Sequence, residues 1–151
     1  MNLPATLTLP DEAATQALGR ALAGALQPGE AICLTGPLGA GKSTLARALV
    51  RALTTPDEDV PSPTFTLVQF YAGARLNVAH FDLYRLASPD EAYEIGLDEA
   101  LDEGAALIEW PQRLEGRLPH NRLDIEIEID GEARIVRLTP HGDFEGRPLE
   151  F

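Results

Sequence analysis

Cysteine is almost missing from this sequence, because Cys33 is the only one among 151 residues. A single thiol can neither close a disulfide within the chain nor build a metal site from paired thiolates. Cys33 lies in the apolar run "AICLT", which predicts a buried core position. The sequence therefore offers no basis for disulfide or thiolate-metal chemistry.

Long hydrophobic runs are also missing. Arg, Gly or Pro interrupts every apolar run well before the roughly 20 residues that a membrane span requires. The N-terminus has no basic start followed by an apolar stretch, as a secretory signal would have. We expect a soluble, cytoplasmic protein, and the length and 44% hydrophobic content predict a single domain over residues 1–151.

Positive charge is the third scarcity, with 12 basic residues against 24 acidic ones and a net charge of −12. Such a chain repels a phosphate backbone unless its basic residues gather on one face, so direct nucleic-acid binding is disfavoured. Lys42 is the only lysine, and the other 11 basic residues are arginines. A lysine kept at this one position indicates a need for a compact, flexible ammonium group.

Helix signals and strand signals alternate along the first half of the chain. Asp11 can cap a helix whose leucines and alanines recur every four residues up to the turn "QPGE". The run 31–35 is typical of a buried parallel strand, and leucines at four-residue spacing mark a second helix after residue 41. The segments 65–71 and 75–84 flank the turn "AGA" and predict a β-hairpin.

The second half continues in the same way. A capping box with Ser88 and Glu91 predicts a helix start at "SPDEAYEI", which Gly96 should interrupt. The run 105–110 is typical of another buried strand, and two alternating segments around Asp130-Gly131 predict a second hairpin. We expect an α/β phosphate-loop NTPase domain with a mixed, mostly parallel central sheet, flanking helices and β-hairpins.

The stretch "GPLGAGKST" follows the strand 31–35 directly and opens the second helix. This context makes the pattern Gly-x-x-x-x-Gly-Lys-Ser specific for a phosphate loop. Glycines let the backbone curl so that its N–H groups surround an anion, and the helix N-terminus adds partial positive charge. Lys42 would reach the terminal phosphates, and the Ser43 hydroxyl would bind Mg²⁺. The expected nucleotide-binding residues are Gly36, Leu38, Gly39, Ala40, Gly41, Lys42, Ser43 and Thr44.

A phosphate loop also needs an acidic side chain for the metal and a group that positions the nucleophile. Asp82 and Glu109 both follow apolar strand residues, so both can lie beside the loop at the carboxyl edge of the sheet. Each is a candidate metal or catalytic residue, although strand-end carboxylates are also common in solvent. His80, two residues before Asp82, is more often an ordinary sheet residue.

Two further residues have open assignments. Thr64 lies in "PSPTF", which resembles the switch segment of other phosphate-loop proteins, so it could contact the metal or the γ-phosphate. A stiff surface connection is an equally good interpretation of this segment. Trp110, the only tryptophan, could stack on a ligand or fill space in the core.

The nucleotide and its chemistry can be narrowed by elimination. GTPases recognise guanine with an Asn-Lys-x-Asp signature, but the only lysine is already in the phosphate loop. A small-molecule kinase remains an alternative, yet no Arg-rich lid segment stands out. An ATPase that serves a partner is the simplest hypothesis, and a nucleotide-binding regulator without turnover is a third.

The motifs "GPLGAGKST", "SPTF", "HFDLYRL", "EIGLDEAL" and "EWPQRL" occur in this order over nearly the whole length. Together they resemble the bacterial threonylcarbamoyladenosine biosynthesis ATPase family, TsaE. Position 37 is Pro where the family more often has Asp, and Ser43 stands where Thr is common. Neither difference removes the loop amides or the hydroxyl.

This resemblance implies an ATPase that binds ATP and Mg²⁺ and supports two larger partners of the TsaB and TsaD type. These partners attach threonylcarbamoyl to adenosine 37 of tRNA, so contact with tRNA would be indirect. The resemblance also implies that Ser43 and Glu109 hold magnesium and that Asp82 supports hydrolysis. It suggests that Thr15 and Arg134 approach the adenosine.

Overall fold

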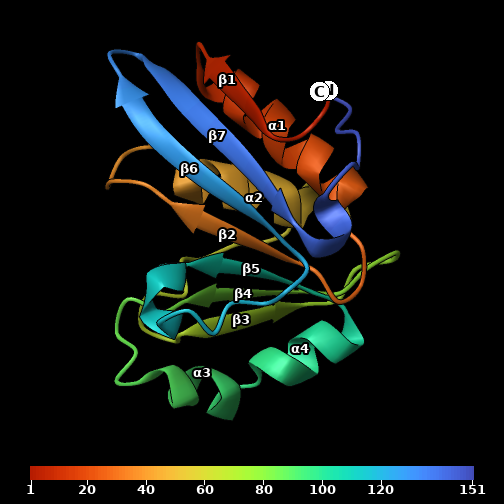
Figure 1. Cartoon of the computed structure of the whole chain (residues 1–151), viewed down its shortest axis with the longest axis vertical. Coiled ribbons are helices and arrows are strands. Elements are labelled where there is room, and N and C mark those ends of the chain that lie inside the picture. The colour runs from red at the N-terminus through yellow and green to blue at the C-terminus, as the bar shows by residue number, and fades with distance from the viewer.

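The computed structural model describes residues 1–151 and contains one seven-stranded sheet with helices on both faces (Figure 1). The strands are β1 (Ala5–Leu9), β2 (Ala31–Thr35), β3 (Val68–Tyr71), β4 (Val78–Asp82), β5 (Ala105–Glu109), β6 (Arg122–Asp130) and β7 (Ala133–His141). The helices are α1 (Glu12–Ala25), α2 (Lys42–Leu53), α3 (Pro89–Glu94) and α4 (Leu97–Glu103), with short 3₁₀ turns at Pro111–Leu114 and Gly142–Phe144.

The strand order is β1-β7-β6-β2-β5-β4-β3. The central neighbours β6, β2, β5 and β4 pair in parallel, whereas β7 and β3 run antiparallel to their neighbours. Because β1 and β6 both pair antiparallel with β7, they point the same way, and five of the seven strands share one direction. This confirms the expected mixed, mostly parallel sheet.

Both expected hairpins are present. In the first, Val68 of β3 pairs with Phe81 of β4, and in the second, Asp130 of β6 pairs with Ala133 of β7 across a two-residue turn. The first hairpin is shorter than predicted because the backbone leaves extended geometry at Leu67, where φ is 69°. The segment 62–67 is thereby free to lie along the carboxyl edge of the sheet.

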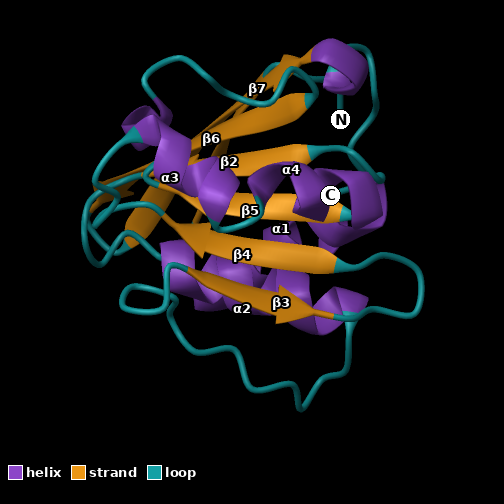
Figure 2. Cartoon of the chain, turned by 90° about the horizontal axis from the view of Figure 1, so that it is seen from below, coloured by secondary structure: helices purple, strands orange, loops and turns teal.

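Helices cover both faces of the sheet (Figure 2), and a hydrophobic core lies between helices and sheet on each face. The larger one packs α1 and α2 against β2 through leucines such as Leu22 and Leu49, and the smaller one packs α3 and α4 against β2, β4 and β5. Strands with both faces covered must be apolar throughout, which explains why β2 reads "AICLT" without alternation. Cys33 belongs to the second core, where burial raises its pKa to about 12, so the thiol stays protonated.

One of the two predicted helix caps is present in the structure, and the other differs in its hydrogen bonds. The Asp11 carboxylate accepts a hydrogen bond from the Ala14 N–H at 2.9 Å, so the predicted cap of α1 is confirmed. The capping box at α3 is wrong in detail. Ser88 caps without a side-chain hydrogen bond, and the Glu91 carboxylate instead accepts from the Ala87 N–H at 2.9 Å.

Two elements of the fold were not expected from the sequence, and a third is shorter than expected. Strand β1 was not expected, although its residues "ATLTL" alternate as an edge strand does. Gly96, with φ of 98°, ends one helix as predicted and also starts the separate helix α4. Strand β5 ends at Glu109, because Trp110 adopts a left-handed conformation with φ of 59°.

None of the helices combines the length and the apolar character that crossing a membrane would demand.

Candidate functional site

A cleft of about 710 Å³ opens at the carboxyl ends of β2, β4 and β5, where the loop before α2 faces two strand-end acids. It brings together most of the residues that the sequence analysis selected. Its lining comprises Gly36, Pro37, Leu38, Gly39, Gly41, Lys42, Ser43, Thr44, Ser62, Thr64, Asp82, Tyr84, Glu109 and Trp110.

The loop between β2 and α2 requires glycine at its two ends. Gly36 has φ of 156°, and a Cβ there would lie 2.7 Å from the Ile127 carbonyl oxygen. Gly41 caps α2 with φ of 102°, a conformation that other residues rarely adopt. The loop conformation is therefore tied to the glycines of the motif.

The N–H groups at the start of α2 are available to an anion. The first backbone donor of the helix with an acceptor in the chain is the Leu45 N–H, which donates to the Gly41 carbonyl at 2.9 Å. The N–H groups of residues 41–44 have no acceptor within the chain, as is usual for the first turn of a helix. Together with the helix dipole they suit a phosphate group. Ala40 differs, because its N–H donates to the Pro37 carbonyl within the loop.

The carbonyl groups of the loop are held from the opposite side by Arg134 of β7. Its Nε donates to the Ala40 carbonyl and its Nη2 to the Gly39 carbonyl, both at 3.1 Å. Its Nη1 donates to the carbonyls of Gly131 and Ala133. Arg134 thus links the second hairpin to the phosphate loop through four backbone carbonyls.

Lys42 has no carboxylate partner. Its Nζ lies 5.2 Å from the centroid of the Trp110 ring, which itself lies 4.8 Å from the Tyr84 ring. Trp110 is bulky and still adopts positive φ, a conformation that costs free energy and often occurs at ligand sites. The left-handed turn after β5 places the Trp110 side chain in the cleft.

Asp82 and Glu109 lie side by side because β4 and β5 are parallel neighbours in which these two residues pair. Alternation places them on the sheet face of Val78 and Leu107, the face that α1 and α2 cover. Both are buried, with exposed fractions of 6% and 7%. Helix α2 starts above this face, so the acids lie beside the first turn that contains Lys42 and Ser43.

Each oxygen of Asp82 accepts a hydrogen bond. The Tyr84 N–H donates to Oδ1 at 3.0 Å, and the Thr64 hydroxyl donates to Oδ2 at 3.2 Å. Thr64 also lies 2.7 Å from the Ser62 hydroxyl. The predicted switch segment is therefore tied to the sheet edge at the cleft.

Glu109 is held at one oxygen only. Its Oε2 lies 2.8 Å from Nε2 of His80, a buried side chain of β4. Its Oε1 has no hydrogen-bond partner within the chain. Of the two acids, Glu109 is thus the one with an oxygen that accepts no hydrogen bond from the chain.

Three of the expected nucleotide-binding residues do not line this cleft. Thr15, Ala40 and Arg134 line a smaller cavity of about 160 Å³ beside it, and Gly39, Gly41 and Thr44 line both. Thr15 is 5% exposed and packs near Gly41.

The donor set suits magnesium bound jointly with a nucleotide. No group of three or more His, Cys, Asp or Glu side chains is arranged to hold a metal ion alone. The cleft instead offers the Ser43 hydroxyl and the two carboxylates beside the anion-binding turn. Mg²⁺ is commonly bound in this way, through one or two protein oxygens plus substrate phosphates.

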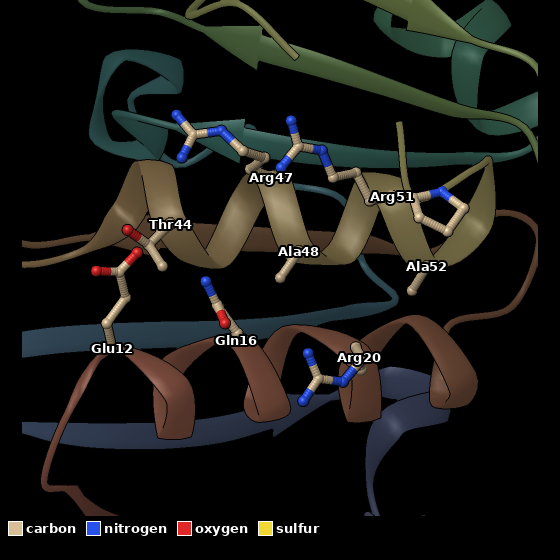
Figure 3. Close-up of a pocket in the computed structure, with 9 residues that line it drawn as sticks. Glu12, Gln16, Arg20, Thr44, Arg47, Ala48, Arg51 and Ala52 are labelled. Carbon is tan, nitrogen blue, oxygen red and sulfur yellow. The ribbon is translucent and has the colours of Figure 1, made fainter. Parts of the chain in front are cut away.

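A second groove of about 460 Å³ runs between α1 and α2 (Figure 3). Arg47 and Arg51 extend from α2, whereas Gln16 and Arg20 extend from α1. Thr44 is the only expected site residue that lines it. This groove shares Thr44 with the cleft but contains neither the acids nor Lys42.

The cleft also involves residues that were not selected from the sequence. Ser62 and Tyr84 line it, and His80, which was set aside, contacts Glu109 from the neighbouring strand without lining the cleft. The signal for His80 and Tyr84 was present, since a period of two places both on the face of Asp82. Nothing in the local sequence showed that His80 would meet Glu109, which lies 29 residues away.

This architecture defines an α/β domain of the phosphate-loop class, with its loop and acids at the carboxyl edge of a mostly parallel sheet. The model of the family "Threonylcarbamoyl adenosine biosynthesis protein TsaE" matches residues 9–136. The chain belongs to the TsaE family, which takes part in threonylcarbamoyladenosine biosynthesis in tRNA.

Individual relatives agree with this assignment. The chain is 37% identical over 146 residues to the tRNA threonylcarbamoyladenosine biosynthesis protein TsaE of Rickettsia felis, covering 96% of this chain and 85% of that one. It is 37% identical over 131 residues to the protein of the same description from Bacillus subtilis, covering 85% and 81%. The crystal structure of YdiB from Bacillus subtilis superposes with a TM-score of 0.74 at 29% identity, covering 95% of this chain and 89% of that one.

Proposed function

We propose that this protein is a Mg²⁺-dependent ATPase that supports threonylcarbamoyl transfer to adenosine 37 of tRNA by partner transferase subunits of the TsaB and TsaD type. The observation that carries the proposal is the single cleft that joins an anion-binding helix start, the only lysine and two buried acids. Membership of a tRNA-modification family supplies the pathway.

The phosphates of ATP would be bound by the N–H groups of residues 41–44, with Lys42 reaching the β- and γ-phosphates. Lys42 suits this role because it has no carboxylate partner to release first. Ser43 and the free oxygen of Glu109 would hold magnesium. The metal supplies charge neutralisation on the phosphate oxygens as the bond to the leaving ADP breaks.

Asp82 and Thr64 would act on the attacking water. The Thr64 hydroxyl donates to Asp82 and sits at the mouth of the cleft, where a water could bond to either side chain. Water attacks the γ-phosphorus, the bond to the bridging oxygen breaks, and ADP and inorganic phosphate form. The proton of the water passes to a phosphate oxygen or to Asp82.

Partner proteins would complete this site. The cleft is open, and two large side chains of its lining, Leu38 and Tyr84, are 99% and 49% exposed. Phe65, next to Thr64 in the chain, is 78% exposed. An open cleft leaves the reacting phosphate partly in water, where electrostatic stabilisation is weak. Docking of the transferase subunits over the cleft would exclude water, so the isolated protein should hydrolyse ATP slowly. An acidic chain suits contact with tRNA through these partners.

The test follows phosphate release from ATP by the isolated protein and after addition of the cognate transferase subunits. Conversion of tRNA adenosine 37 is measured in parallel with and without this protein. We expect faster hydrolysis with the partners and more modified tRNA. Unchanged rates of both reactions would contradict the proposal, and phosphate transfer from ATP onto a metabolite would identify a kinase instead.

A further inference from the structure

His80 is a buried polar residue that the proposed hydrolysis does not use. It lies in the middle of β4, two residues before Asp82, and its side chain is 3% exposed. Its Nε2 lies 2.8 Å from Oε2 of Glu109 at the end of the neighbouring strand β5. Its other ring nitrogen, Nδ1, is buried without any hydrogen-bond partner.

The chemistry of this pair fixes the position of the proton. An ionised carboxylate can only accept hydrogen bonds, so Nε2 of His80 must carry the hydrogen that the two atoms share. A proton on Nδ1 as well would leave a buried donor without an acceptor, which is costly. The geometry therefore places the shared hydrogen on Nε2 of His80, the ring nitrogen that faces Glu109.

The two acids of the cleft are held differently. Asp82 accepts a hydrogen bond at each oxygen, from Tyr84 and from Thr64. Glu109 accepts one hydrogen bond, at Oε2, and its Oε1 has no partner. A hydrogen-bond donor to one oxygen fixes the orientation of the carboxylate. It thereby determines which oxygen can bind a ligand in the cleft.

We propose that His80 is a positioning residue for magnesium-ATP. Its Nε2–H holds Oε2 of Glu109, so that Oε1 faces the ligand at a fixed angle. This inference rests on the proposed function, because it assigns the free oxygen to the metal. It adds a residue that acts through Glu109 and touches neither nucleotide nor water.

Two substitutions of similar polarity separate this role from simple packing. In His80→Gln the side-chain amide nitrogen takes the place of Nε2 and can still donate to Glu109. In His80→Asn the amide reaches only to the place of Nδ1, so the bond to Glu109 is lost. The affinity for ATP is measured for both variants and the wild type, with Mg²⁺ and with EDTA, alongside thermal unfolding.

We expect wild type and His80→Gln to gain similar ATP affinity from Mg²⁺. For His80→Asn we expect an ATP affinity in Mg²⁺ about tenfold lower than that of the wild type. A loss of this size is typical when the residue that hydrogen-bonds to a metal ligand is removed. The affinity of this variant in EDTA should be unchanged. An equal response of all three proteins to Mg²⁺ would overturn the positioning role, even if both variants unfold at lower temperature.

A second measurement uses the unaltered protein. Nitrogen-15 NMR of the histidine rings should show His80 with a hydrogen on Nε2 and a bare Nδ1. The opposite tautomer would overturn the inference without reference to ATP. If the wild type binds ATP with no effect of Mg²⁺, the proposed function itself fails, whereas failure of His80 alone leaves that magnesium response intact.

Discussion

The two halves of the sheet differ in sequence, burial and chemistry. In the parallel half, β2, β4 and β5 are buried along nearly every residue, and the last residues of β4 and β5 line the cleft with the loop that follows β2. In the other half, β1, β7 and β6 pair antiparallel with one another, β6 and β7 alternate between buried and exposed residues, and no side chain of these three strands lines the cleft. The site residues thus lie where parallel strands end at the same edge of the sheet. The polar residues at the strand ends meet the start of the following helix there.

One side chain of the antiparallel half forms hydrogen bonds with the loop of the site. Arg134 of β7 binds the carbonyls of Gly39 and Ala40 from behind the loop. A loop whose carbonyls are held on one side presents its N–H groups on the other. The residues that would meet the ligand thus belong to the parallel half, whereas Arg134 of the antiparallel half holds the loop in shape.

The largest expected effect is on the free energy of unfolding. Two Leu→Ala variants test whether a change in the antiparallel half can lower stability without changing ATP affinity. Leu138→Ala in β7 removes a side chain that is 1% exposed and should lower the free energy of unfolding by about 2–5 kcal/mol. ATP affinity of the folded protein should stay unchanged. Leu107→Ala in β5, directly beneath the acids, should cost similar stability and also weaken ATP binding. Chemical denaturation and calorimetric titration measure the two quantities, and equal effects on affinity would argue against separate halves.

The next effect concerns Lys42. Lys42→Ala should weaken ATP binding about 100-fold, since a charged hydrogen bond contributes about 1.5–3 kcal/mol. Lys42→Arg should also be harmful, because a planar guanidinium on a longer stem does not fit among the loop amides. Calorimetric titration with ATP gives the affinities.

The control for Lys42→Arg is the opposite substitution, Arg to Lys, in the antiparallel half of the sheet. Arg137→Lys on β7 changes an exposed residue that pairs with Glu128, and ATP affinity should not change. Full activity of Lys42→Arg would show that the single lysine was not retained for its shape.

A smaller effect is expected at the metal. Glu109→Gln keeps the size of the side chain but removes its charge, and it should weaken ATP binding about tenfold in Mg²⁺ and little in EDTA. Asp82→Asn should slow hydrolysis while leaving the Mg²⁺-dependent affinity nearly intact. Phosphate release and titrations at varied Mg²⁺ separate the two acids. If Glu109→Gln matched the wild type in affinity and in turnover, Glu109 would be an ordinary strand-end carboxylate.

The smallest effect is expected at Arg134. Arg134→Gln removes two hydrogen bonds to the loop. Because these bonds hold the loop and not the ligand, ATP binding should weaken only about threefold to tenfold, or roughly 0.7–1.4 kcal/mol. Inorganic triphosphate should lose affinity by the same factor, because a loop-holding residue affects only the phosphate site. Arg137→Gln on the same strand serves as the control. A loss for ATP alone would instead assign Arg134 to the adenosine, as the family resemblance suggests.

Local sequence accounted for most of the fold. Short-range signals predicted the helices after Asp11 and Gly41, both hairpins and the central strands, because capping, turn residues and side-chain period act within a few residues. The same signals failed at Ser88, whose hydroxyl makes no capping bond, and at β1, whose pairing depends on a strand over 120 residues later. Edge pairing is a long-range property that a five-residue pattern cannot specify.

The sequence by itself determined the phosphate loop, because its glycines, Lys42 and Ser43 are adjacent in the chain. Composition alone also singled out Lys42. Only the tertiary structure decided that Glu109 contacts His80, that Asp82 accepts a hydrogen bond from Thr64, and that Arg134 donates to the loop carbonyls. These contacts join residues 18 to 95 positions apart, and they exist because the register of neighbouring strands brings those residues to one edge.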